Sequence, residues 1–131
     1  MGTGQEFLIL IVEKEENSSG LIRDWVFRNP VSSVFVASGV DALLWLGRGN
    51  LPDLILADAG MKSMDGPEFI RTLKSSGFFQ EIPVLAYGNP EEHPMLAGMR
   101  QAGAMGHIFL PDDASGLDQR LSGFMELELK A

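Results

Sequence analysis

The sequence predicts an α/β domain in which helices cover both faces of a parallel sheet. Three observations support this fold class. Apolar runs of strand length alternate with helical stretches five times along the 131 residues. The runs are continuously apolar, which is typical of strands that are buried on both faces. Successive runs are joined through helical stretches, which favours right-handed crossovers between parallel strands.

The first half of the chain predicts three strands and two helices. The first strand is Phe7–Val12, six apolar residues that end in a charged stretch. Hydroxyl and amide side chains at 17–19 can cap the first helix, which Asn29-Pro30 ends. A short strand follows at 34–37, and Ser38 can cap the second helix. We assign the apolar face of the second helix to Val40, Leu43, Leu44 and Trp45. The third strand is Leu54–Ala57, which the glycines at 47 and 49 separate from the second helix.

The second half predicts two more strands, each followed by a helix. The third helix begins near Asp65 and carries Pro67 in its first turn, where a missing N–H does no harm. The fourth and fifth strands are expected at 82–87 and 107–110. Pro94 obscures the start of the fourth helix, because proline must lie in a first turn or break the helix. The apolar face of the last helix consists of Leu117, Leu121, Phe124 and Met125.

Composition limits the classes of function. The chain has a length typical of one domain, with 45% hydrophobic and 21% charged residues, and no apolar run long enough for a membrane span. Its net charge of −8 argues against nucleic-acid or anionic-membrane binding, which need Lys and Arg to offset phosphates. The absence of cysteine excludes a disulfide, a thiolate metal site and a thiol nucleophile. We expect residues 1–5 to be a disordered start and 6–131 a single domain. The absence of an export signal favours a cytoplasmic location.

Two acidic strand ends are expected to meet in one crevice. Asp58 directly follows the third strand, and Glu13-Lys14-Glu15 follows the first. In open α/β sheets, ligands bind outside the carboxyl ends of the strands, so these residues are the candidate site. The simpler alternative is that Asp58 only caps the turn after its strand. No glycine-rich phosphate loop follows the first strand, which argues against flavin or nucleotide binding.

The strand and loop around Asp58 carry a family resemblance. Residues 52–58 read PDLILAD, and Met61 and Met64-Asp65-Gly66 follow. Supporting matches are Ile82-Pro83-Val84, Ala102-Gly103-Ala104 and Pro111. Over nearly its whole length the sequence resembles the receiver domain of bacterial response regulators. This resemblance implies a flavodoxin-like sheet of order 2-1-3-4-5 with five helices, and a role in two-component phosphorelay signalling.

The resemblance implies that Asp58 is the phosphoacceptor, but the metal-binding residues around it are changed. In the family, an acidic pair after the first strand holds Mg²⁺ together with the phosphoacceptor and the backbone carbonyl two residues beyond it, here Gly60. That pair is Glu13-Lys14 in this chain, which places an ammonium where an acid touches the metal. No cofactor is therefore expected, apart from weak Mg²⁺ binding through Glu13 or Glu15, Asp58 and the Gly60 carbonyl.

The residues that respond to the phosphoryl group in the family are also replaced. Its lysine at the end of the fifth strand falls at Leu110. Its Ser or Thr at the end of the fourth strand falls at Gly88, or has no counterpart if a gap is placed in this strand, and neither alignment supplies a hydroxyl. Its aromatic switch residue falls at His107, which is either a pH-sensitive substitute or a surface histidine without function. We assign His107, Met95 and Met99 to a switch and partner surface, with core filling as the alternative for the methionines.

We therefore interpret the chain as a degenerate receiver that acts as a protein-interaction module, not an enzyme, with impaired Mg²⁺-dependent phosphorylation. The alternative is a functional receiver that accepts a phosphoryl group on Asp58 from a histidine kinase. Lys14 suggests a further hypothesis, in which its ammonium replaces Mg²⁺ as a counterion to Asp58, or else it points to solvent. The expected partner is a histidine kinase or a downstream signalling protein, and the expected state is a monomer or weak homodimer. Further domains can follow in a longer protein.

Overall fold

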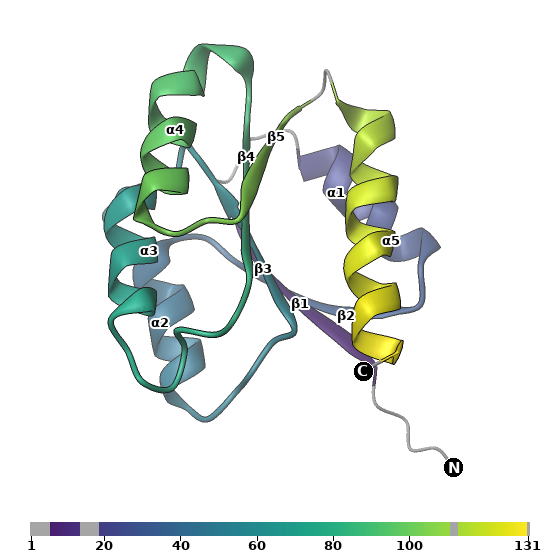
Figure 1. Ribbon diagram of the computed structural model, residues 1–131, viewed down its shortest axis with the longest axis horizontal. Helices are drawn as coiled ribbons and strands as arrows, with labels where there is room; N and C mark the ends of the chain where they lie inside the picture. Colours follow the sequence, from purple (N-terminus) through teal and green to yellow (C-terminus); the bar gives the residue numbers. More distant parts are fainter. Residues whose placement is uncertain (1–5, 14–18, 111–112, 131) are drawn as a thin grey trace.

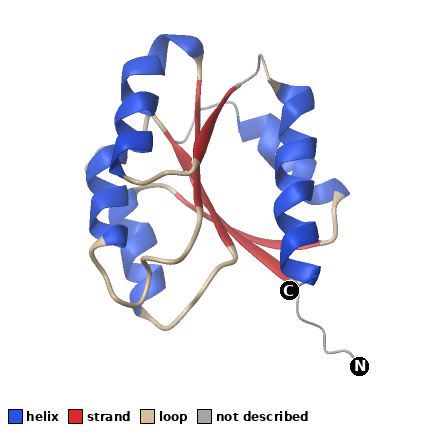
Figure 2. Cartoon of the chain, viewed as in Figure 1, coloured by secondary structure: helices blue, strands red, loops and turns tan. Residues whose placement is uncertain are grey.

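The computed structural model describes residues 6–13, 19–110 and 113–130. Its centre is a five-stranded parallel sheet of order β2-β1-β3-β4-β5, which confirms the predicted topology (Figure 2). The strands are β1 (Phe7–Val12), β2 (Val31–Val36), β3 (Leu54–Asp58), β4 (Val84–Gly88) and β5 (Gly106–Phe109).

Helices cover both faces of the sheet, as Figure 1 shows. One layer contains α1 (Ser19–Arg28) and α5 (Ala114–Lys130). The other contains α2 (Gly39–Gly47), α3 (Gly66–Lys74) and α4 (His93–Ala102). A single 3-10 turn, η1 (Pro90–Glu92), leads into α4.

Each helical layer packs on its own apolar core. Strand residues alternate between the two faces, so Leu10 and Val12 of β1 join the core under α2–α4, while Ile9 and Ile11 join the core under α1 and α5. Burial of these side chains from water is the main force that holds the layers together. The same alternation decides which side chains meet at the strand ends.

The start of β2 differs from the prediction. The strand begins at Val31, three residues earlier than expected, because Ser32 and Ser33 pair with Leu8 and Ile9 of β1. All six residues of β2 are only partly buried, since β2 is an edge strand with one neighbour. Ser32 and Ser33 are tolerated at this edge. Because they are polar, the sequence pattern did not indicate that the strand begins before them.

The entry into α4 shows how both prolines near it are accommodated. Asn89 caps η1 and forms a capping box with Glu92, in which each side chain accepts a hydrogen bond from the other's backbone N–H. Pro90 opens η1 and Pro94 lies in the first turn of α4, positions where no N–H is needed. Pro94 thus leaves α4 unbroken.

The predicted apolar face of α2 is wrong at two positions. Val40 and Leu44 are 43% and 59% exposed, and the helix buries Gly39, Ala42 and Leu46 instead. Glycine at position 39 leaves room for a side chain of α3, since a Cβ there would lie 3.2 Å from the Phe69 ring. Large apolar residues of α2 point to several sides of the helix, so the spacing of apolar residues did not define which face is buried.

No helix in the described ranges combines the length and apolar character that crossing a bilayer requires. The predicted disordered start, residues 1–5, lies outside those ranges.

Candidate functional site

Asp58 ends β3 and is fully buried at the centre of the sheet. Its Oδ1 accepts a hydrogen bond of 2.8 Å from the backbone N–H of Gly60. The following residue, Ala59, donates its N–H to the carbonyl of Tyr87, so the chain leaves β3 still tied to β4. The carboxylate is therefore held at the carboxyl end of the sheet, where the fold class predicted a site.

Glu13 follows β1 and lies on the α1 side of the same strand ends. Its Oε1 accepts a 3.0 Å hydrogen bond from the hydroxyl of Tyr87, the β4 residue that pairs with Asp58. Its Oε2 lies 3.7 Å from a guanidinium nitrogen of Arg23, whose side chain also stacks on Phe35 at 4.1 Å. Glu13 and Asp58 are the two charged residues with buried side chains in the described chain.

Burial sets the protonation behaviour of this group. Loss of solvent raises the pKa of Glu13; the Tyr87 hydrogen bond and Arg23 oppose the shift, and Asp58 adds to it. Burial also raises the pKa of the Tyr87 hydroxyl well above its usual value, and the charges of Asp58 and Glu13 raise it further. Tyr87 is therefore a neutral donor at physiological pH.

The described residues fit a divalent cation poorly. They contain no cluster of three acidic, histidine or cysteine side chains that could hold a metal ion. Both oxygens of Glu13 already face donors, and Oδ1 of Asp58 accepts from Gly60. Lys14 and Glu15, predicted to border this crevice, lie outside the part of the chain that the structure describes.

The α4 side of the strand ends is occupied by Glu92. Its Oε1 accepts a 3.0 Å hydrogen bond from the Asn89 backbone and lies 2.7 Å from the place where a Cβ at position 88 would be. The Cβ of Ala59 lies 3.0 Å from the same place. Gly88 therefore leaves room for a carboxylate beside the chain that follows Asp58.

Leu110 follows β5 and points away from Gly88, although its N–H donates to the Gly88 carbonyl at 2.8 Å. Its side chain is buried in the core under α5, together with Leu117 and Leu121. The Leu110 side chain is apolar, so it places no charge at the end of β5.

Comparison with known proteins identifies the family to which the chain belongs. The family model for the response regulator receiver domain matches residues 9–122. The chain belongs to this family. Receiver domains act in two-component signalling.

Curated and solved relatives agree with this assignment. The chain is 32% identical over 103 residues to the Regulator of RpoS of Escherichia coli, an alignment that covers 79% of this chain and 30% of the relative. The chain thus spans about a third of the length of that curated relative. A putative response regulator from Chloroflexus aurantiacus has a similar fold, with a TM-score of 0.83, 19% identity and coverage of 93% of this chain and 99% of the other.

A further solved neighbour is the receiver domain of a sensor histidine kinase from Pseudomonas aeruginosa, which has a magnesium ion coordinated in its active-site cleft. Its TM-score is 0.80 at 20% identity, with coverage of 93% of this chain and 99% of that one. At this identity the likeness extends to the fold alone.

His107, which the resemblance places at the switch position, packs in an aromatic cluster on the α4 side of β5. Its ring lies 5.0 Å from the Phe109 ring and 6.3 Å from the His93 ring. Its buried Nδ1 has no hydrogen-bond partner among the residues described. Burial lowers the pKa of His107; Arg100, His93 and Arg120 lower it further, and Asp113 opposes them. The imidazole is therefore neutral at physiological pH.

The two methionines assigned to a partner surface differ in position. Met99 is fully buried against the start of α3, where a Cβ on Gly66 would lie 2.5 Å from its sulfur. The surface assignment is therefore wrong for Met99, which is core filling in this receiver. Met95 is only partly buried at the edge of the same core.

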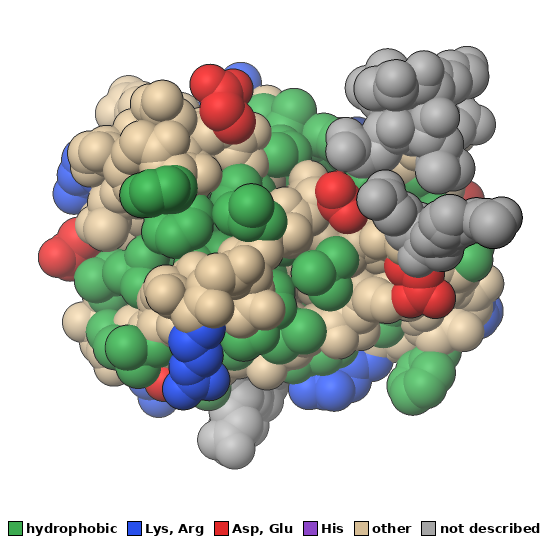
Figure 3. Space-filling view, turned by 90° about the horizontal axis from the view of Figure 1, so that it is seen from below, with side chains coloured by type: hydrophobic (Ala, Val, Ile, Leu, Met, Phe, Trp, Pro, Cys, Tyr) green, Lys and Arg blue, Asp and Glu red, His purple; other side chains and the backbone are tan. Residues whose placement is uncertain are grey.

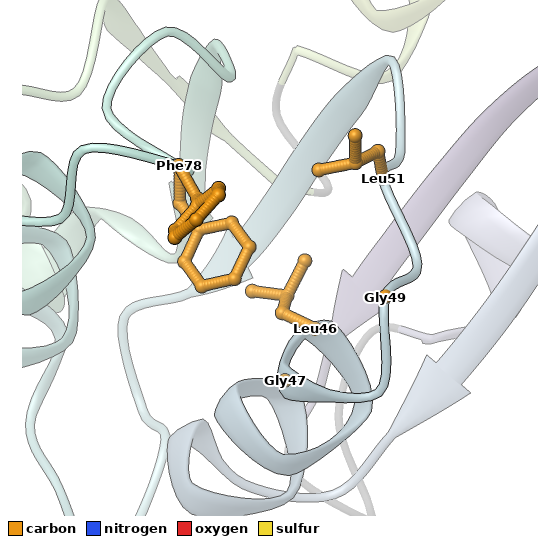
Figure 4. A pocket seen from close by; sticks show the side chains of 6 residues that line it. Leu46, Gly47, Gly49, Leu51 and Phe78 are labelled. Atoms are coloured by element: carbon orange, nitrogen blue, oxygen red, sulfur yellow. The ribbon is translucent and has the colours of Figure 1, made fainter.

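An apolar pocket lies at the opposite end of the sheet from Asp58. Figure 4 shows Leu46 of α2, Leu51 of the loop before β3 and Phe78 of the segment after α3 around this pocket, which has a volume of about 410 Å³. Figure 3 views the molecule from this end, and hydrophobic side chains gather there. The pocket is remote from the strand ends that carry Asp58, so it belongs to no part of the crevice.

Sequence reasoning missed three residues of the crevice. Tyr87 was counted as part of an apolar strand, although it is the single tyrosine of the chain. Arg23 lies on a predicted helix, where nothing in the local sequence indicates a role. Glu92 falls three residues after Asn89, and that Asn-x-x-Glu spacing is the signal of a capping box that could have located it.

Proposed function

We propose that this receiver signals through protein contact and that ordinary Mg²⁺-dependent phosphorylation of Asp58 is impaired. The observation that carries the proposal is the Glu92 carboxylate beside Gly88. By the resemblance, receivers place a hydroxyl at position 88 that follows the phosphoryl group. Here the corresponding space contains a fixed anion instead, with Oε1 only 2.7 Å from the missing Cβ.

The charges around Asp58 also support impaired phosphorylation. A transferring phosphoryl group carries negative charge that cations must offset. The described strand ends present the carboxylates of Asp58, Glu13 and Glu92. Leu110 supplies no ammonium, and Arg23 already faces Glu13. A phosphoryl group on Asp58 would add charge to a site that is already acidic.

The partner we expect is a histidine kinase or a downstream signalling protein in the cytoplasm. The Escherichia coli relative is named a regulator of RpoS, and regulation of another protein by contact needs no chemistry in the crevice. Because the chain covers only 30% of that relative, its whole activity is not transferred to this chain.

A working phosphoacceptor is the second candidate. Asp58 favours it, because this carboxylate keeps its place at the end of β3 and its charge reaches Glu13 and Tyr87. Mg²⁺ binding would then be weak, through Asp58, Glu13 and the Gly60 carbonyl.

Amide NMR separates the two candidates. Labelled protein is titrated with Mg²⁺, alone and with beryllofluoride, a phosphoryl mimic, while the amide signals of Asp58, Gly60, Gly88 and His107 are followed. We expect these signals not to shift at millimolar Mg²⁺. Shifts at Asp58 and Gly60 that carry His107 with them would establish a working phosphoacceptor and overturn the proposal.

A matched variant checks that the assay can detect an opened pocket. In Glu92→Gln the side chain keeps its size and its carbonyl can still accept from Asn89, but the negative charge is lost. If the Glu92 carboxylate helps to exclude the phosphoryl group, this variant should bind beryllofluoride more tightly than the parent does. Equal binding would show that the Glu92 charge does not keep a phosphoryl group out, and would remove the observation that carries the proposal.

A further inference from the structure

The outer face of α2 is apolar and exposed. Val40, Leu44 and Arg48 follow one another at intervals of four residues, so they form one row along the helix and its C-terminal cap. Leu44 is 59% exposed at the middle of this row. A surface helix of a globular protein normally carries polar residues on the side away from the core, whereas α2 exposes Val40 and Leu44 there, alongside Asp41 and Arg48.

A hollow beside this row, with both polar and apolar lining, extends the surface onto the end of β2. It measures about 350 Å³ and is lined by Phe35, Val36, Ala37, Asp41, Leu44, Trp45 and Arg48. β2 is the edge strand next to it, with its outer side unpaired by any strand of the sheet. The row of α2 and the hollow together form one surface, which we call the α2 face.

The charges on the α2 face are arranged symmetrically. Asp41 lies in the first turn of α2 and Arg48 at its C-terminal cap, and both are exposed. The midpoint between these positions falls between Leu44 and Trp45. If a second α2 lies antiparallel across this midpoint, Asp41 of each copy faces Arg48 of the other, and Leu44 of each faces Trp45 of the other.

We propose that the α2 face pairs with a second copy of this chain in an antiparallel, two-fold symmetric dimer. A two-fold interface brings the same patch of both copies together, so it must be self-complementary in shape and charge. The α2 face meets the charge requirement through Asp41 and Arg48, and its apolar centre supplies the buried contact.

The dimer is weak. A nine-residue helix is only about 13 Å long, and pairs of such helices bury less than the ~800 Å² per partner of a standard interface. The net charge of −8 on each copy also opposes association. Pairing is therefore expected only at high protein concentration, and this inference stands whether or not Asp58 is phosphorylated.

Sedimentation velocity of the full chain from about 10 μM to 1 mM measures the pairing. The parent is expected to shift from monomer toward dimer across this range. Leu44→Glu places a charge at the centre of the interface and should weaken dimerisation at least about tenfold. Phe27→Glu, at an 87% exposed position on α1 in the other helical layer, is the matched control and should leave the dimer unchanged.

Charge reversal tests the arrangement itself. Asp41→Arg alone sets like charges against each other and should weaken the dimer, whereas Asp41→Arg combined with Arg48→Asp restores opposite pairs and should restore it. The double variant should not pair with the parent chain. A parent that stays monomeric at 1 mM overturns the proposal, as does a double variant that dimerises no better than the single one while circular dichroism shows both folded.

Discussion

Tyr87 and Glu13 show how a single hydroxyl stabilises a buried carboxylate. The hydroxyl donates to Glu13 across 3.0 Å, and no other hydrogen bond to this carboxylate is present among the described residues, where Arg23 is a longer ion pair. Removing one partner of a buried pair leaves the other unsatisfied, which costs about 1–3 kcal/mol. We expect Tyr87→Phe to lower the free energy of unfolding by this amount at pH 7, measured by urea denaturation.

The cost of Tyr87→Phe should depend on pH. Because burial raises the pKa of Glu13, the folded protein binds this proton more readily than the unfolded chain between the usual value of 4.5 and the raised value. Stability from this group therefore increases as pH falls through that window. Protonated Glu13 carries no charge that needs the hydroxyl, so Tyr87→Phe should cost less at acidic pH. In a Glu13→Gln background the pH dependence of that cost should vanish; if it persists, another group is responsible.

The sequence predicted those site residues whose local context indicates their position in the fold, and it missed the others. Asp58 and Glu13 could be found because a carboxylate directly after a buried strand has one plausible location. Tyr87 could not, since its strand context is apolar and its hydroxyl partner lies 74 positions away in sequence. The position of Glu92 depends on the 3-10 turn η1. Pro90 and Pro94 showed that the chain there is irregular, but they did not predict this turn.

The packing of α3 on α4 depends on a glycine. A Cβ on Gly66 would lie 2.5 Å from the sulfur of Met99, which is fully buried and cannot move into solvent. Overpacking of this kind costs about 1–3 kcal/mol. We expect Gly66→Ala to destabilise the protein to that extent in urea denaturation, although alanine is the better helix former.

Gly123 provides the control for this prediction. It lies inside α5, and a Cβ there would meet nothing within 4 Å. Gly123→Ala should therefore stabilise the protein by up to about 1 kcal/mol through helix propensity. Equal effects of the two substitutions would show that Met99 rearranges freely and that the contact is unimportant.

At the level of elements, the sequence predicted the order of strands and helices but not every surface. Alternation and continuous apolar runs identified all five strands because burial on both faces requires such runs. The start of β2 was missed because an edge strand tolerates Ser32 and Ser33. The inner face of α2 was misplaced at Val40 and Leu44, and the same two residues now form the row that we assign to dimerisation.

For the whole molecule, the receiver fold is kept while the chemistry around its acceptor is altered. The sheet order and both helical layers agree with the receiver fold. By the resemblance, the altered positions follow or end three different strands in the sequence: Lys14 after β1, Gly88 at the end of β4, and Leu110 after β5. Because these changes affect three separate elements around one crevice, we propose that this receiver does not take up a phosphoryl group.

Chemical phosphorylation tests this claim most directly. The protein is incubated with acetyl phosphate and Mg²⁺, and intact mass spectrometry follows the parent chain beside Asp58→Asn and a typical receiver as positive control. Our account predicts that the typical receiver gains one phosphoryl group while the parent chain gains none. A phosphoryl adduct on the parent chain that is absent from Asp58→Asn would contradict it and make Asp58 a working phosphoacceptor.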